Sequence, residues 1–155
     1  MNSQLIALLP QLVPLAAQWA AKQELRILQD GVPLSSVSLA DARLIGVEFP
    51  ERIRLLKIDA IPVPEDPILA QAAAVAELLT PATAGLTIRH GIFIRSDCWN
   101  DRRLIAHECA HTAQYERMGG IEQFLAQYLR ECIEIGYPAA PMEQEAVEAE
   151  NLIGE

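Results

Sequence analysis

Apolar residues recur at helical spacing in several parts of the first half of the chain. The pattern over residues 12–29 predicts an amphipathic helix that packs on the core. The stretch "SLADARLIGV" predicts a short helix with Ser38 as its cap and Gly46 near its end. In "DPILAQAAAVAELL", Asp66 is the expected cap and Pro67 the first helical residue. The nearly continuous Ala/Leu face of this last segment predicts a well-buried helix.

Two stretches show the alternation typical of β-strands. "RIRLLKIDAIPVP" has β-branched residues in partial alternation and ends in two prolines, so it predicts a strand. In "GLTIRHGIFIRSD", apolar and polar residues alternate on either side of His90-Gly91, a pair that favours a tight hairpin turn. The sequence therefore predicts a small sheet that includes one hairpin.

The second half of the chain returns to helical spacing. A helix is expected over residues 98–118, with Ser96 or Asp97 as its cap and Gly119 as part of its stop signal. "IEQFLAQYLRECIEI" places its apolar side chains on one stripe, and a last helix restarts near Pro141. The predicted fold is α+β, mostly helical with a small antiparallel hairpin before the helix of residues 98–118.

Length and composition indicate one soluble globular domain over residues 1–155. Hydrophobic residues make up 51% of the chain and charged residues 21%, and the net charge of -9 argues against nucleic acid as a partner. Pro10 and Pro14 interrupt the apolar N-terminal stretch, which has no Lys or Arg before Lys22, so we expect neither an export signal nor a membrane span. Three cysteines without a CxxC pair favour a reducing cytoplasm.

The segment "LIAHECAHTAQYERMGG" carries the candidate chemistry. On a helix, His107 and His111 lie about 40° apart around the axis and one turn apart along it, so both imidazoles can reach one point. Glu108 is next to His111 on the helical wheel, whereas Cys109 points away. This H-E-x-x-H pattern predicts a zinc site with two histidine ligands and a neighbouring carboxylate as general base. The alternative is an ordinary amphipathic helix that binds no metal.

A hydrolytic zinc site needs a third protein ligand. No histidine follows His111, so a downstream carboxylate is expected. The motif His107, Glu108 and His111, followed by Gln114 and Tyr115 and by the acidic stretch "YPAAPMEQEA", resembles the gluzincin branch of zinc metallopeptidases, in particular its small, compact members.

The resemblance implies a zincin-like metal-binding core over residues 81–155, preceded by a helical and strand region over residues 1–80. It also implies that the third ligand is a glutamate on a later helix, and Glu143, the first acidic residue after the proline, is the first choice. Many family members have an Asp four residues after that glutamate, where this chain has Val147, so Glu145 stays an alternative. A solvated row of glutamates is the other interpretation of this stretch.

The implied activity is zinc-dependent hydrolysis of peptide or protein substrates, with Glu108 as general base. A catalytically inactive zincin-like binding or structural protein is the alternative. Tyr137 is a candidate donor to a developing oxyanion, unless it only packs, and Gln114 is a candidate hydrogen-bond partner of a ligand histidine. His90 is assigned to the hairpin turn, and by the resemblance residues 92–95 would offer an extended substrate a strand edge.

Overall fold

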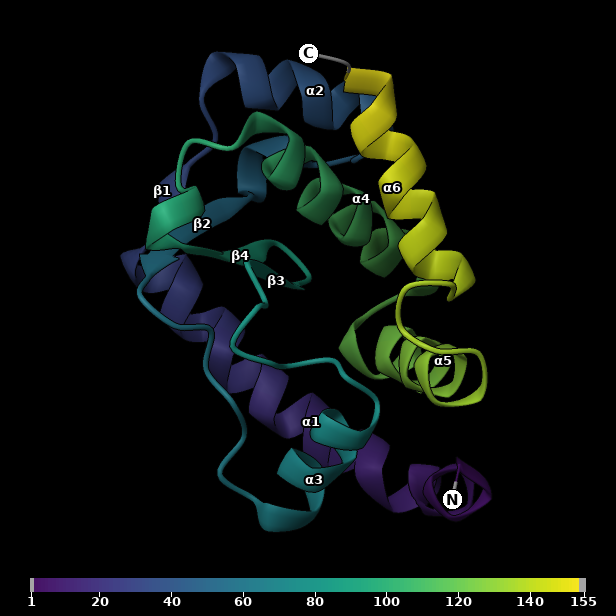
Figure 1. Ribbon diagram of the computed structural model, residues 1–155. Coiled ribbons are helices and arrows are strands. Elements are labelled where there is room, and N and C mark those ends of the chain that lie inside the picture. Colours follow the sequence, from purple (N-terminus) through teal and green to yellow (C-terminus); the bar gives the residue numbers. More distant parts are fainter. Residues whose placement is uncertain (1, 154–155) are drawn as a thin grey trace.

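The computed structural model describes residues 2–153 (Figure 1). Six α-helices, two short 3-10 helices and four strands follow one another in this part of the chain. They are α1 (Asn2–Asp30), β1 (Val32–Pro33), α2 (Ser36–Ile45), η1 (Pro50–Arg52), β2 (Arg54–Ile58), α3 (Pro67–Val75), β3 (Gly85–Ile88), β4 (Gly91–Arg95), η2 (Ser96–Cys98), α4 (Arg102–Met118), α5 (Ile121–Glu134) and α6 (Pro141–Ile153). The predicted α+β class is confirmed.

The strands form one mixed sheet in the order β1-β2-β4-β3. β4 pairs in parallel with β2 and antiparallel with β3, so it lies inside the sheet, and its Ile92, Phe93 and Ile94 are completely buried. The expectation that residues 92–95 offer a strand edge is therefore wrong. The hairpin pattern alone does not show which of its two strands lies at the edge of the sheet. Because β2 pairs with the other side of β4, β3 is the edge strand.

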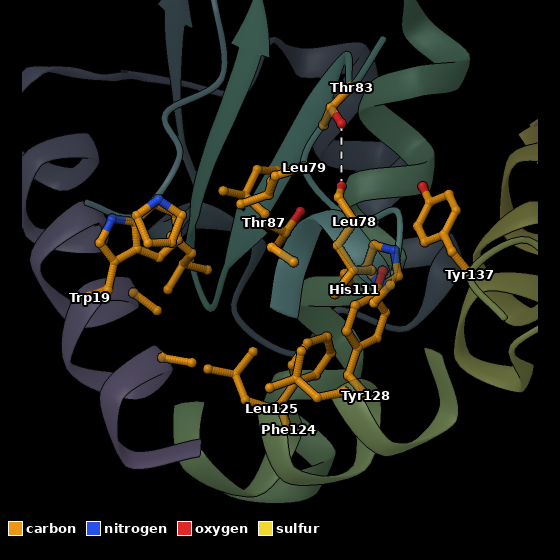
Figure 2. Close-up of a pocket in the computed structure, with 18 of the residues that line it drawn as sticks. Trp19, Leu78, Leu79, Thr83, Thr87, His111, Phe124, Leu125, Tyr128 and Tyr137 are labelled. Carbon is orange, nitrogen blue, oxygen red and sulfur yellow. Dashed lines mark hydrogen bonds between the residues drawn. The ribbon is translucent and has the colours of Figure 1, made fainter. Parts of the chain in front are cut away.

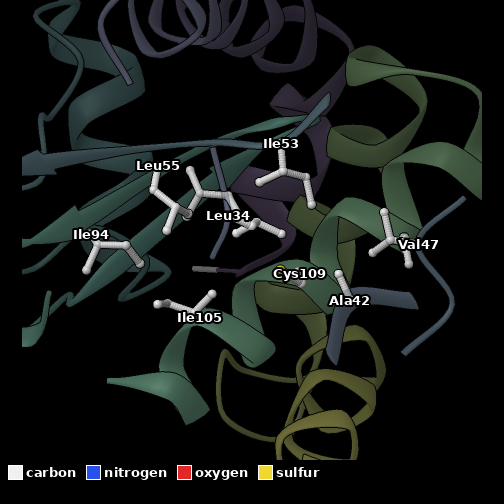
Figure 3. Packing of buried hydrophobic residues seen from close by; sticks show 10 residues of the cluster. Leu34, Ala42, Val47, Ile53, Leu55, Ile94, Ile105 and Cys109 are labelled. Carbon is white, nitrogen blue, oxygen red and sulfur yellow. The ribbon is translucent and has the colours of Figure 1, made fainter. Parts of the chain in front are cut away.

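Helices cover both faces of the sheet. On one face Ile92 and Ile94 pack against Ile105 of α4 in a cluster that also includes side chains of α2 (Figure 3). On the other face Phe93 packs against Ile27 of α1. This alternation along β4 is what a strand buried on both sides requires. As a result α4 is fixed on the sheet beside β3, and α6 runs along α4 on its other side (Figure 1).

The first helix is longer than the sequence pattern predicts. α1 begins at Asn2 rather than near residue 12 and continues through Pro10 and Pro14. A proline inside a helix removes a backbone hydrogen bond. Here the early part of α1 gains apolar contacts instead, because Leu9 and Val13 are buried in a cluster that includes a side chain of α5. This packing explains why the prolines do not end the helix.

By length and composition alone, one described helix segment, Ser3–Asp30, is apolar enough to cross a membrane. The same test is passed by core helices of soluble proteins and by signal sequences near an N-terminus, so the indication is weak. In the structure α1 packs against α5 and against both β3 and β4 (Figure 1). The fold therefore uses α1 as a packing element of a compact molecule.

Two predicted helix caps are wrong. Ser35 caps α2 by accepting a hydrogen bond from the backbone N–H of Ser38, so Ser38 lies within the first turn. Asp101 caps α4 by accepting from Leu104, whereas residues 96–98 form a separate 3-10 turn. In both cases the cap is the polar residue three positions before the donor it satisfies.

α3 is less buried than its apolar sequence predicts. Asp66 caps the helix and Pro67 is its first residue, as expected. Leu69 is its buried residue, while Ile68 and Val75 are exposed. The hairpin turn also differs in detail: Arg89 and His90 form it, and Gly91 already pairs with Ile88. α3 is therefore only partly packed against the rest of the protein.

Candidate metal centre

Helix α4 carries its candidate metal ligands on one face and packs against the sheet with another. Asp101 caps its first turn, and Gly119 ends it in the left-handed conformation at φ 97°, which favours glycine. Cys109 is 1% exposed and packs into the cluster between α4 and the sheet (Figure 3). His107 and His111 lie on the side that faces α6 and α5. The predicted separation of the thiol from the two imidazoles is confirmed.

Glu143 from α6 joins the two imidazoles. Its Oε1 lies 3.1 Å from His107 Nε2 and its Oε2 lies 2.8 Å from His111 Nε2. The three ligand atoms are within 4.8 Å of one another, a grouping that could hold a metal ion. Ligand atoms about 2 Å from one tetrahedral ion lie roughly 3.3 Å apart. The two nitrogen–oxygen separations of 3.1 and 2.8 Å are close to that value.

The tautomer of His111 follows from its neighbour Gln114. The amide nitrogen of Gln114 donates to the carbonyl of Met142 at 2.9 Å and to Glu145 at 2.7 Å. The amide oxygen of Gln114 must therefore accept from His111 Nδ1, at 2.8 Å. His111 then presents Nε2, without a proton in its neutral form, toward Glu143. The predicted possibility that Gln114 contacts a motif histidine is confirmed, with His111 as that histidine.

Glu150 performs the same task for His107. Its Oε1 lies 2.9 Å from His107 Nδ1, which leaves Nε2 to face Glu143. The sequence analysis did not single out Glu150. It is seven residues after Glu143, which is two helical turns and the same face of α6, so this spacing is the signal that was available. Val147, four residues after Glu143, is exposed.

Glu145 has different partners. Its Oε1 accepts from Gln114 and from Arg117 Nη2, both at 2.7 Å. Glu143, in contrast, is 4% exposed and faces both imidazoles. Of the two carboxylates that the sequence left open, the structure brings Glu143 to the histidines.

Tyr128 of α5 is a further contact that the sequence analysis missed. Its hydroxyl donates to Glu143 Oε2 at 2.6 Å. The ring packs edge-on against His111, with centroids 5.8 Å apart. In the sequence, Tyr128 belongs to the apolar stripe of "IEQFLAQYLRECIEI", and that pattern cannot show where a hydroxyl points. The carboxylate is thereby held in place from a third helix.

The protonation of the cluster reflects these contacts. Burial lowers the pKa of His107, but the hydrogen bond to Glu143, the charge of Glu108 and the hydrogen bond to Glu150 outweigh it and raise the pKa to about 9. Burial also lowers the pKa of His111, but the hydrogen bond to Glu143 together with the charges of Glu108 and Glu143 outweighs burial and raises this pKa. Burial raises the pKa of Glu143, yet the two imidazoles hold it well below its usual range. Without a metal, the two imidazoles of the cluster therefore favour their protonated form, and a cation that binds there would displace these protons.

Glu108 is directed by strand β3. Its Oε1 accepts from Thr87 Oγ1 at 2.7 Å, and the same hydroxyl contacts the backbone carbonyl of Glu108 at 3.0 Å. A Cβ at Gly85 would lie 3.0 Å from the Glu108 side chain. A side chain at this position would displace the Glu108 carboxylate by a few tenths of an ångström. Glu108 thus lies next to the cluster with its own partner and is not one of the three grouped ligands.

Two hollows meet at this centre. A cavity of about 130 Å³ is lined by Glu108, His111 and Glu143 together with apolar side chains (Figure 2). An open groove of about 540 Å³ reaches His107 and Glu108 from the other side. Gly85, Glu108 and Tyr137 line both hollows. A substrate that crosses the centre would therefore pass beside β3.

Tyr137 lines both hollows, and Figure 2 shows it on the same side of the cavity as His111, opposite Trp19. Burial, with the charges of Glu143 and Glu108, raises its pKa, so the hydroxyl keeps its proton at neutral pH. Its use as a donor to an oxyanion stays a prediction. His90 lies in the hairpin turn, as predicted, with its Nε2 2.9 Å from Glu116.

Comparisons with family models, curated proteins and solved structures found no match for the chain. The site itself offers two imidazole nitrogens, one carboxylate and a second carboxylate close by. His107, His111 and Glu143 are thus a donor set that could hold a metal ion.

Proposed function

We propose that this protein is a zinc-dependent metallopeptidase of the gluzincin type. The observation that supports this most strongly is the arrangement around Glu143, where two imidazoles turn Nε2 to one carboxylate while oxygen acceptors hold both Nδ1 atoms. His107, His111 and Glu143 would hold the ion. Two nitrogens and one oxygen, with a position left open, are typical of catalytic zinc.

When bound, zinc supplies Lewis-acid chemistry that activates water and polarises a substrate carbonyl. Glu108 takes the proton from the attacking water and later passes it to the leaving amine. Thr87 keeps the carboxylate beside the three ligand groups by donating to Oε1 at 2.7 Å. The protonated hydroxyl of Tyr137 donates to the oxygen that gains negative charge.

The proposed substrates are peptides or proteins that lie extended along β3. Arg95 N donates to the carbonyl of Ala84 at 2.8 Å, and hydrogen-bonded pairs alternate along antiparallel strands. The backbone groups of Gly85 and Thr87 therefore point away from β4. The Thr87 carbonyl already accepts from Tyr115, so the backbone of Gly85, which lines both hollows, is the part of this edge proposed for the peptide. Extended peptides bind such edges through main-chain hydrogen bonds. Three free cysteines fit action in the cytoplasm.

Metal analysis and peptide hydrolysis together test this proposal. Purified protein should contain about one zinc ion per chain and cleave a mixed peptide library. Glu108→Gln should keep the zinc and lose turnover, because it removes the base but none of the ligands. His111→Ala and Glu143→Gln should lose both, while Glu148→Gln, at an exposed position of α6, serves as the matched control and should keep both.

The outcomes separate the competing functions. Bound zinc without hydrolysis of any library peptide would overturn the peptidase and favour a zincin-like binding protein. Protein that takes up no stoichiometric zinc, even when supplied with it, would overturn the metal site itself.

A further inference from the structure

The N-terminal region forms part of the wall of the cavity next to the candidate metal centre. Trp19 comes from α1, and Ala72 and Ala73 come from α3. In Figure 2, Trp19 lies at one side of the cavity and His111 with Tyr137 at the other, with Leu125 and Phe124 of α5 below. The hollow thus extends from His111 and Glu143 into a space that residues 81–155 alone do not enclose.

Several polar groups of this cavity are already hydrogen-bonded within the protein. Thr87 donates to Glu108, and Tyr115 donates to the carbonyl of Thr87 at 3.2 Å. Tyr128 donates to Glu143. No lysine or arginine of the described residues lines the cavity. A charged guest would lose its water and find no counter-charge away from the metal centre, which costs several kcal/mol by rough estimate.

Resting on the proposed peptidase function, we propose that the cavity receives an aromatic or large aliphatic side chain of the substrate, next to the bond that is cleaved. Its volume of about 130 Å³ is close to that of an apolar cavity of about 150 Å³ known to bind benzene. The N-terminal region then sets specificity, with Trp19 and Ala72 as the selecting residues. A folded partner or a second copy is too large for this space.

Matched peptides that differ at one residue test the selectivity. At the substrate position next to the cleaved bond, the wild-type protein should prefer phenylalanine or leucine over glycine or aspartate. Ala72→Phe fills the cavity and should lower kcat/KM for the phenylalanine peptide roughly tenfold or more, with little change for the glycine peptide. Ala74→Phe, on the exposed side of the same helix, is the control and should change neither.

A binding measurement makes the test independent of catalysis. The chain has two tryptophans, so Trp99→Phe leaves Trp19 as the sole fluorescent reporter in the cavity. In this background the emission of Trp19 should shift on titration with N-acetylphenylalaninamide but not with N-acetylglycinamide. Adding Ala72→Phe should remove the response. If circular dichroism shows that Ala72→Phe is misfolded, Ala73→Phe is used in its place.

The two readouts distinguish the two proposals. A Trp19 response without hydrolysis of any peptide would overturn the peptidase and keep an apolar binding cavity. Hydrolysis without preference for large apolar residues, together with no Trp19 response, would overturn the specificity proposal and keep the peptidase.

Discussion

Gln114 decides which nitrogen of His111 is offered to the centre. Its amide nitrogen has two oxygen acceptors, so its amide oxygen is left for His111 Nδ1. The orientation of one buried amide therefore fixes the tautomer of an imidazole. Glu150 does the same for His107 with a carboxylate. At the scale of residues, the centre depends on partners that never touch the ion.

Replacing Gln114 with leucine should weaken zinc binding roughly 10- to 100-fold, the usual effect of removing the group that orients a ligand histidine. The change leaves His111 Nδ1 without its partner. Competition with a zinc chelator measures the dissociation constant. Gln127→Leu, at an exposed position on α5, is the control, and equal affinities for the two variants would contradict the role given to Gln114.

The ion pairs of the cluster predict a pH window for the metal-free protein. His107 changes from an unfolded pKa of 6.5 to about 9, so its contribution is complete below 6.5 and lost as pH rises through 9. The pKa of Glu143 falls from 4.5, so its contribution is complete above 4.5 and lost at lower pH. The stabilisation should therefore be largest between about 4.5 and 6.5.

Urea unfolding with a chelator present checks this window. The difference in unfolding free energy between wild type and Glu143→Gln should be on the order of 3 kcal/mol inside the window and shrink on both sides. A difference that grows between pH 6.5 and 9 would show that the imidazoles are not charged partners of Glu143.

At the scale of elements, the approach of β3 to α4 positions the proposed base. β3 contacts α4 through Thr87 and Glu108, and Gly85 leaves room for the Glu108 side chain. A strand at the sheet edge has one side free for this purpose. The same edge is the one we propose for the substrate, so β3 serves both the base and the peptide.

Gly85→Ala tests the close approach of β3 to the Glu108 side chain. The added methyl would lie 3.0 Å from Glu108 and push its carboxylate by a few tenths of an ångström. Turnover should fall roughly tenfold, because small displacements of a catalytic group are costly. Zinc content, measured on the same sample, should stay unchanged, since none of the three ligands moves. Loss of zinc together with turnover would mean that β3 supports the whole cluster.

At the scale of the whole molecule, the centre joins helices that are separated in sequence. α4 supplies two of the grouped residues, α6 supplies the third, and α5 holds Glu143 through Tyr128. Ala110 of α4 packs against Ala146 and Ala149 of α6, and these small side chains let the helices come close. A bound ion would therefore tie the C-terminal helix to the core.

Removing the metal should lower thermal stability. A ligand at 100 times its dissociation constant adds about 2.7 kcal/mol, which corresponds to a shift in Tm of roughly 5–10 °C for a chain of this size. Calorimetry with saturating zinc and with excess chelator measures the shift. In Glu143→Gln the two scans should coincide, and a full shift in that variant would place the ion elsewhere.

The local parts of this protein could be predicted from its sequence. Helical spacing places His107 and His111 on one side of α4 and Cys109 on the other, because one helix fixes those angles by itself. Asp66, Pro67 and Pro141 also mark helix starts correctly, since caps act within a single turn. The α+β class follows from the same local periods.

Tertiary structure decided everything that depends on how distant segments meet. Which glutamate of α6 faces the imidazoles depends on the rotation of α6 against α4, and the sequence left Glu143 and Glu145 open for that reason. β4 became an inner strand because β2 pairs with it, a contact between distant segments. The burial of α3 and the partners Glu150 and Tyr128 depend in the same way on packing. Short-range angles are fixed by the backbone, whereas long-range contacts are fixed only by the sum of all packing energies.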